Sequence, residues 1–187
     1  MEKIARIVLT GSESTGKTEL ARALAAHYRT AWAAEYVRDY LDAKGGALDA
    51  GDVEAIARGQ MAREDSAFSA SPRENGFTRR RGGRGENLII LDTDLFSTVI
   101  YACHYYGSCP EWIERAAHER RGDLYLLLDV DAPWTADPQR DRGERREGMH
   151  TLFRDALEAA GARVVIIRGG WEERRTRAIE AIDAFLA

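Results

Sequence analysis

One stretch of the sequence has the residue types and spacing of a phosphate-binding loop. It runs Gly-Ser-Glu-Ser-Thr-Gly-Lys-Thr and matches the pattern G-x-x-x-x-G-K-[ST] in full. Glycines let the backbone curl so that successive N–H groups face one anion, and the helix that follows adds the positive end of its dipole. Lys17 is placed to reach the β and γ phosphates of ATP, and the Thr18 hydroxyl to ligate Mg²⁺. The predicted ATP-binding residues are Gly11, Ser12, Glu13, Ser14, Thr15, Gly16, Lys17 and Thr18.

A second candidate is an apolar run that ends in two acids. Residues 88–94 read Leu-Ile-Ile-Leu-Asp-Thr-Asp. Asp92 ends the predicted strand, where a carboxylate would meet Mg²⁺ or its water shell, so Asp92 and Thr18 form the predicted metal site. Asp94 is suited either to cap the following helix or to act on the acceptor, and both readings stay open. Asp129 ends a similar run, as a site residue or as part of a turn.

The segment from Asp137 to Arg146 is dense in guanidinium groups. Phosphoryl transfer spreads negative charge over the migrating group, and mobile arginines can close over it and exclude water. We therefore predict a small arginine-rich lid over residues 132–147, with Arg140, Arg142 and Arg145 contacting the phosphoryl group. The alternative is a solvated loop with internal Arg–Asp pairs.

Candidates for binding the phosphoryl acceptor lie in a predicted short strand and directly after it. Glu35 could accept a proton from a substrate hydroxyl or hold ribose hydroxyls. Trp32 could stack on a planar ring or pack in the core. Arg38 could line the site or pair with Asp42 on its own helix.

The elements that must position these residues alternate along the chain. Apolar runs predict five strands, and helical periodicity predicts seven helices. This alternation implies right-handed crossovers and an α/β three-layer sandwich, of the P-loop kinase type, with a mostly parallel five-stranded sheet and helices on both faces. Ligands on such sheets bind at the carboxyl ends of the strands, where Gly11, Glu35, Asp92 and Asp129 fall. The predicted strands cover 4–10, 30–34, 88–91, 124–128 and 164–167, and the helices 17–28, 36–43, 52–68, 95–106, 110–120, 144–160 and 171–186.

Length and composition indicate one soluble globular domain over residues 1–187. The chain is 44% apolar and 31% charged, and its net charge of −4 argues against a general nucleic-acid binder. It has no apolar run long enough for a membrane span and no signal-peptide pattern at its start. Two cysteines fit neither a disulfide framework nor a zinc site, so we expect a cytoplasmic protein. Residues 71–86, rich in glycine and charge, are predicted to be a mobile basic loop.

Taken together, four motifs resemble the ribosylnicotinamide kinase domain of the NadR family, an AAA_28-like P-loop family. The resemblance covers nearly the whole chain apart from residues 71–86. The motifs are the Glu-Ser-Thr filling of the loop, Trp32…Glu35-Tyr36-x-Arg38, Leu91-Asp92-Thr93-Asp94 and Pro133-Trp134-Thr-Ala-Asp137-x-x-Arg140.

The resemblance implies ATP- and Mg²⁺-dependent phosphorylation of nicotinamide riboside on its 5′-hydroxyl, giving nicotinamide mononucleotide. It implies that Trp32 and Tyr105 flank the nicotinamide ring, a cationic pyridinium that aromatic faces would attract. Glu35 and Asp94 would be the acids on the acceptor side, and Arg140 would anchor the lid. Arg38 and Asp137 would complete the substrate-binding set.

Three other functions remain open at this stage. The first is a P-loop kinase of another nucleoside or nucleotide. The second is a non-catalytic ATP-sensing module that reports to a partner. The third is an ATPase stimulated by nucleic acid, which the negative net charge disfavours.

Overall fold

The computed structural model describes residues 3–70, 88–131 and 146–187. The predicted basic loop over 71–86 lies outside these residues, and so does the predicted lid up to residue 145. Within the described ranges, no helix is both long enough and apolar enough to cross a membrane.

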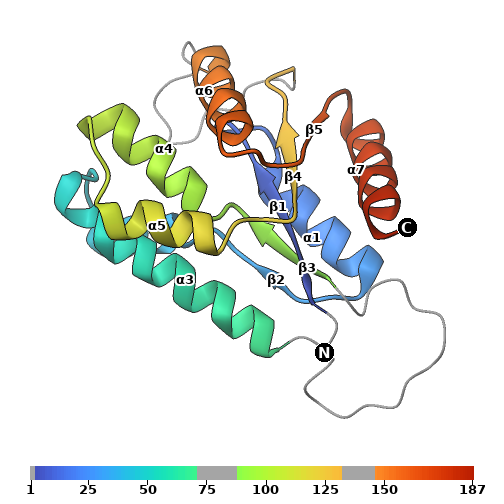
Figure 1. The fold of residues 1–187 in the computed structure, drawn as a ribbon, viewed down its shortest axis with the longest axis horizontal. Helices are drawn as coiled ribbons and strands as arrows, with labels where there is room; N and C mark the ends of the chain where they lie inside the picture. Colours follow the sequence, from blue (N-terminus) through green and yellow to red (C-terminus); the bar gives the residue numbers. More distant parts are fainter. Residues whose placement is uncertain (1–2, 71–87, 132–145) are drawn as a thin grey trace.

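The strands form one parallel sheet in the order β2-β3-β1-β4-β5 (Figure 1). This arrangement confirms the predicted α/β fold with a five-stranded sheet. The strand expected over 30–34 is shorter than predicted, because only two of its residues pair with the neighbouring strand. The strands are β1 (Ala5–Thr10), β2 (Trp32–Ala33), β3 (Leu88–Asp92), β4 (Leu124–Leu128) and β5 (Val164–Ile167).

The helices cover both faces of the sheet. α1 and α7 pack on one face, and α3, α4, α5 and α6 lie on the other (Figure 1). Their bounds lie within a few residues of the prediction, and a short 3-10 turn (Ala50–Asp52) leads into α3. The helices are α1 (Lys17–Tyr28), α2 (Tyr36–Lys44), α3 (Val53–Ser69), α4 (Leu95–Tyr106), α5 (Glu111–Glu119), α6 (Arg146–Ala159) and α7 (Trp171–Leu186).

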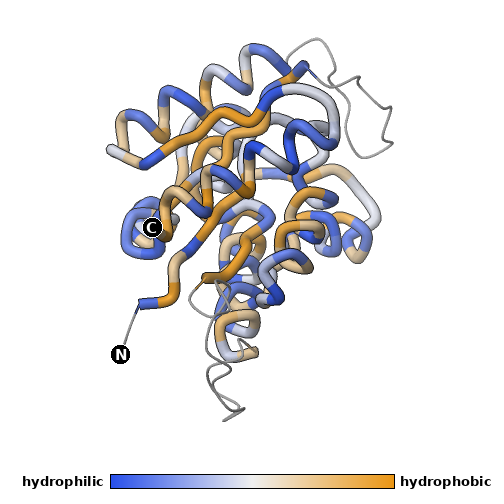
Figure 2. The backbone as a smooth tube through the Cα atoms, turned by 90° about the vertical axis from the view of Figure 1, so that its right-hand side faces the viewer, coloured by the Kyte–Doolittle hydropathy of each residue, from blue (hydrophilic) through white to orange (hydrophobic). Residues whose placement is uncertain are grey.

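The strands divide the core because successive side chains of a strand point to opposite faces. Ile7 and Leu9 of β1 join the cluster under α1 and α7, whereas Val8 joins the cluster under α3, α4 and α5. β3 and β4 are buried along their whole length, as apolar runs covered on both sides should be. Figure 2 shows the hydrophobic central strands with helices of mixed hydropathy around them. The same alternation decides on which face each candidate site residue lies.

Candidate functional site

The phosphate-binding loop has the backbone conformation that its sequence predicts. Gly11 has φ +123°, and a Cβ there would lie 2.9 Å from the carbonyl oxygen of Leu128, so only glycine fits between β1 and β4. Ser14 and Gly16 also have positive φ, of 53° and 86°. Left-handed residues spaced in this way turn main-chain N–H groups toward one concave surface.

The Lys17 side chain lies along this loop and is only 6% exposed. Its ammonium donates hydrogen bonds to the carbonyls of Gly11, at 3.0 Å, and Ser12, at 2.8 Å. The hydroxyl of Thr15 also donates to the Ser12 carbonyl, at 3.0 Å. Lysine and loop therefore form one structure, with a cation at the position where phosphate charge would be received.

Asp92 lies at the end of β3 with its carboxylate buried beside the loop. Neither of its oxygens has a hydrogen-bond partner of good geometry among the described residues. Burial, and next the charge of Glu35, raise the pKa of Asp92 to about 6, while the nearby Thr18 hydroxyl and the Lys17 ammonium lower it. A buried carboxylate whose nearest polar neighbour is a threonine hydroxyl fits Mg²⁺, which takes few protein ligands and completes its shell with water and phosphate.

This candidate metal site contains few protein ligands. Among the residues that the structure describes, no three His, Cys, Asp or Glu side chains form a cluster that could hold an ion on their own. Magnesium at Asp92 and Thr18 would therefore depend on the nucleotide for the rest of its shell.

Asp94 occupies the capping position, which corrects its assignment to the acceptor site. Its Oδ1 accepts the N–H of Phe96 at 3.1 Å, at the start of α4, and its Oδ2 accepts the Tyr125 hydroxyl at 2.6 Å. The side chain is buried and does not line the pocket described next. Both oxygens are used inside the fold, so none points to a substrate.

A pocket of about 180 Å³ opens beside the loop, between α2, α3 and α4. Lys17 and Glu13 line it from the loop, Glu35 and Arg38 from the start of α2, and Tyr101, Tyr105 and Tyr106 from α4. The lining residues are Glu13, Lys17, Glu35, Val37, Arg38, Leu41, Leu48, Asp49, Val53, Ile56, Gln60, Thr93, Ser97, Thr98, Tyr101, Ala102, Tyr105 and Tyr106.

Glu35 and Arg38 form a pair at the edge of this pocket. The Nε of Arg38 donates to Oε2 of Glu35 at 3.1 Å, one helical turn apart. The main chain here is tied to α3, because the N–H of Tyr36 donates to Oε1 of Gln60 at 2.9 Å and Arg63 donates to the Glu35 carbonyl at 3.2 Å. The Glu35 carboxylate is therefore presented to the pocket from a fixed turn.

Tyr36 also fixes the distance between this turn and α3. Its ring lies directly on Gly59, where an added Cβ would lie 2.0 Å from a ring carbon. Glycine at position 59 is required by this close approach and not by backbone conformation.

The tyrosines of α4 form a flat aromatic wall. Tyr101 and Tyr105 stack with ring centroids 6.0 Å apart and an interplanar angle of 2°. Tyr101 also packs edge-on against Phe153 of α6, whereas Tyr105 remains 42% exposed. Tyr105 thus lies where a planar ring could stack on it.

Trp32 lies on the opposite face of the sheet, which corrects its predicted stacking role. Its side chain packs against the cluster under α1 and α7, with the Arg22 guanidinium 5.4 Å from the ring centroid. It does not line the pocket beside the loop. The reason is strand alternation: Trp32 pairs in register with Ile90, which belongs to the same cluster.

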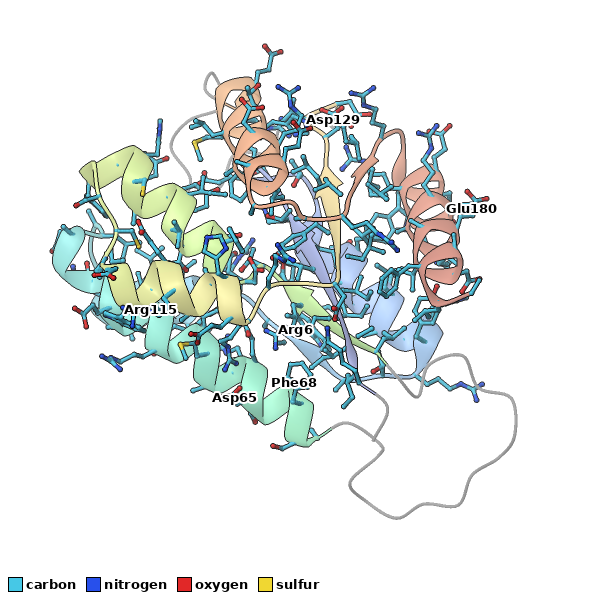
Figure 3. The ribbon with its side chains drawn as sticks, in the orientation of Figure 1. Arg6, Asp65, Phe68, Arg115, Asp129 and Glu180 are labelled. Carbon is cyan, nitrogen blue, oxygen red and sulfur yellow. The ribbon has the colours of Figure 1, made fainter. Side chains whose placement is uncertain are left out.

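The remaining predicted residues lie elsewhere. Asp137, Arg140, Arg142 and Arg145 fall outside the described ranges. Asp129, at the carboxyl end of β4, bonds to Arg168 at 2.5 Å and does not line the pocket (Figure 3).

Sequence reasoning missed several residues that shape the site. Tyr101 and Gln60 line the pocket, and their helical spacing relative to Tyr105 and Ile56 was a usable signal. Arg146 and Arg174 bond to carbonyls of the phosphate-binding loop. Their positions in the sequence gave no signal, because both contacts join segments more than 130 residues apart.

The parallel sheet, the glycine loop and the acid at the neighbouring strand end define the class: this is an α/β protein with the P-loop kinase fold. The chain belongs to the AAA_28 family, whose model, described as an AAA domain, matches residues 6–174.

Curated relatives confirm the resemblance to the NadR family. The chain is 26% identical over 187 residues to the "Trifunctional NAD biosynthesis/regulator protein NadR" of Salmonella typhimurium, and 27% identical over 183 residues to that of Escherichia coli. These matches cover 96% and 94% of this chain but only 42% and 41% of the relatives.

Solved structures share the fold. A crystal structure of NadR protein in complex with NR superposes with a TM-score of 0.74, at 24% identity, over 98% of this chain and 51% of that one. Thymidylate kinase from Ehrlichia chaffeensis superposes with a TM-score of 0.66, at 16% identity, over 96% and 97%.

Proposed function

We propose that the protein transfers the γ-phosphoryl group of ATP to the 5′-hydroxyl of nicotinamide riboside. The observation that carries the proposal is that Lys17 belongs both to the phosphate-binding loop and to the wall of the adjacent pocket. A triphosphate on the loop would thus end where a bound acceptor begins. In-line transfer requires this proximity, and positioning supplies much of the rate of such reactions.

Each group of the site has a role in this proposal. The loop residues from Gly11 to Thr18 hold ATP, and Asp92 with the Thr18 hydroxyl holds Mg²⁺. Magnesium would supply charge neutralisation on the phosphates. Glu35 orients the acceptor hydroxyl and receives its proton, and Arg38 keeps the Glu35 carboxylate in place.

The chemistry of the pocket supports a cationic, planar acceptor. Its lining includes three carboxylates, Glu13, Glu35 and Asp49, against the two cations Lys17 and Arg38, and Tyr105, backed by Tyr101, offers an aromatic face. A pyridinium ring is attracted to both features. The NadR protein that superposes on this chain was crystallised with NR, which supports the same choice.

The arginine-rich segment completes the proposed site. Arg140, Arg142 and Arg145 would neutralise the migrating phosphoryl group, and Asp137 would contact the acceptor. These assignments rest on the sequence and on the charge that phosphoryl transfer develops.

An acceptor screen tests the proposal. Purified protein is incubated with Mg-ATP and separate candidate acceptors, and products are identified by mass spectrometry. We expect nicotinamide mononucleotide from nicotinamide riboside. The structural likeness to thymidylate kinases favours a second candidate, a kinase of nucleoside monophosphates. Turnover of thymidylate without turnover of nicotinamide riboside would replace the first candidate by the second. Tight ATP binding without acceptor-dependent ADP release would favour a sensing module.

A further inference from the structure

We propose that Arg146 and Arg174 are positioning residues that hold the phosphate-binding loop in the conformation that receives a polyphosphate. They come from α6 and α7, and they donate to the carbonyls of two consecutive loop residues. The inference deepens the proposed function, since it rests on the loop being a polyphosphate site.

Arg174 is the more deeply buried of the two, at 4% exposed. Its Nη1 donates to the carbonyl of Thr15 at 2.6 Å, and its Nε donates to that of Gly169 at 2.8 Å. Its Nη2 donates to the carbonyl of Asp129 at 3.0 Å and to the carboxylate of Asp131. One planar guanidinium therefore joins the loop to the ends of β4 and β5 and to the first turn of α7.

Arg146 repeats the contact one residue earlier in the loop. Its Nη2 donates to the carbonyl of Ser14 at 3.3 Å, from the start of α6. Two helices near the C-terminal end of the sequence thus support a loop that lies near its beginning.

Because the peptide bond is planar, these contacts also fix the direction of the neighbouring N–H groups. In a trans peptide the C=O and N–H point in opposite directions. A guanidinium that holds the Thr15 carbonyl on the outer side of the loop therefore directs the Gly16 N–H inward, and the bond to Ser14 does the same for the Thr15 N–H. The positive φ values of Ser14 and Gly16 agree with this alternation.

Most carbonyl groups of the loop accept a hydrogen bond from within the protein. Those of Gly11 and Ser12 accept from Lys17, and that of Gly16 accepts the N–H of Leu20. In contrast, the N–H groups of Thr15 and Gly16 donate to no group in the part of the chain that is described. The loop carbonyls thus point away from the concave surface of the loop, and the N–H groups of Thr15 and Gly16 remain available as donors. An anion requires this arrangement.

The test compares Arg174→Lys and Arg146→Lys with the control Arg175→Lys. Lysine keeps the charge but cannot reproduce the planar fork of several donors. Arg175 follows Arg174 on the same helix, and its guanidinium pairs with the exposed Glu172 at 3.7 Å. Binding of Mg-ATP and of inorganic tripolyphosphate is measured by calorimetry, and folding by circular dichroism.

We expect Arg174→Lys to weaken both ligands by roughly tenfold or more, and Arg146→Lys to weaken both by a smaller factor, as the loss of charge-assisted bonds implies. Arg175→Lys should bind both as the parent protein does. Tripolyphosphate carries only the group that the loop would hold. An equal loss for both ligands therefore supports positioning of the loop, and a loss for ATP alone overturns it.

Folded variants that bind both ligands like the parent protein would also overturn the inference. Should Arg174→Lys fail to fold, Arg146→Lys decides by the same criterion. The parent protein shows separately whether the proposed kinase function fails. A parent protein that binds both ligands but phosphorylates no acceptor refutes the kinase proposal and leaves this inference in place. A parent protein that binds neither ligand refutes both.

Discussion

The hydroxyl of Tyr125 donates a 2.6 Å hydrogen bond to Oδ2 of Asp94, in a buried position below the carboxyl end of the sheet. The other oxygen of Asp94 caps α4, the helix that carries Tyr101 and Tyr105 to the pocket. Burial is the main reason that the pKa of Asp94 is raised to about 7, against the hydrogen bonds that lower it. A carboxyl group thus orients one wall of the pocket without facing it.

The raised pKa of Asp94 predicts a pH dependence of stability. The folded protein holds this proton more tightly than the unfolded chain, whose carboxyl has the ordinary value of 3.8. The resulting stabilisation is fully present below pH 4 and is lost as the pH rises toward and through 7. Asp94→Asn keeps an oxygen for the cap and carries no charge. It loses the acceptor of the Tyr125 hydroxyl, so we expect it to be less stable than the parent at pH 4, and we expect this deficit in the free energy of unfolding to shrink by up to about 4 kcal/mol on going to pH 8.

Urea unfolding at pH 4 and pH 8 checks this prediction. The free energy of unfolding of the variant should rise with pH relative to that of the parent. Glu54→Gln, at an exposed position on α3, serves as the control and should show no such growth. A difference that is the same at both pH values would contradict the assignment of the proton to Asp94.

Activity separates the two acids at the end of β3. Asp94→Asn should leave kcat/KM within about twofold, because the amide oxygen can still cap α4 and the side chain does not line the pocket. Asp92→Asn should lower kcat by at least about a hundredfold, because the carboxylate that we propose holds Mg²⁺ is lost. Both are measured over a range of magnesium concentrations. The reverse ranking would return Asp94 to the catalytic role.

Lys17→Ala should abolish transfer while the protein remains folded. The ammonium would no longer receive phosphate charge, and we expect kcat/KM for ATP to fall by at least about a hundredfold. Lys3→Ala, at an exposed position far from the loop, is the control. Activity retained by Lys17→Ala would remove the basis of the mechanism.

Trp32→Ala should change stability and leave substrate binding intact, whereas Tyr105→Ala should do the reverse. Trp32 packs under α1, so its loss should lower the free energy of unfolding by about 2 kcal/mol and leave both KM values unchanged. Tyr105 lines the pocket, so its loss should raise the KM of the acceptor by about tenfold and leave stability nearly unchanged. Steady-state kinetics with ATP and acceptor varied in turn, together with thermal unfolding, measure both profiles.

Glu35→Gln tests the proposed proton acceptor. The amide keeps the shape of the side chain but cannot take a proton, so kcat should fall by about a hundredfold or more while the KM of ATP changes little. Asp39→Asn is the matched control, since Asp39 is exposed on the same helix and pairs with Arg63. Equal effects of the two substitutions would indicate that Glu35 acts only through the placement of α2.

The sequence predicts those parts of the molecule that depend on local pattern. Continuous apolar runs marked β3 and β4, and the Gly-x-x-x-x-Gly-Lys-Thr spacing marked the loop, because each pattern has one structural solution that is far more stable than others. Glu35 and Tyr105, both predicted to bind the acceptor, line the pocket, and their roles there stay predictions.

Local sequence pattern does not predict which way a side chain points. The roles that depend on this direction could not be predicted. Trp32 was assigned to the pocket, and register in a two-residue strand sends it to the other face. Asp94 had two locally acceptable roles, and only Tyr125, from a distant strand, decides between them. Arg174 depends entirely on long-range packing.

The contact of Gly59 with the ring of Tyr36 has a consequence for re-engineering. The separation between α3 and the turn that carries Glu35 depends on the absence of a Cβ at position 59, and Gly59 itself does not line the pocket. Restoring that methyl would wedge α3 away from the turn that carries Glu35. Substitution at position 59 would therefore shift the pocket residues of α3 against Glu35 without replacing any residue that lines the pocket.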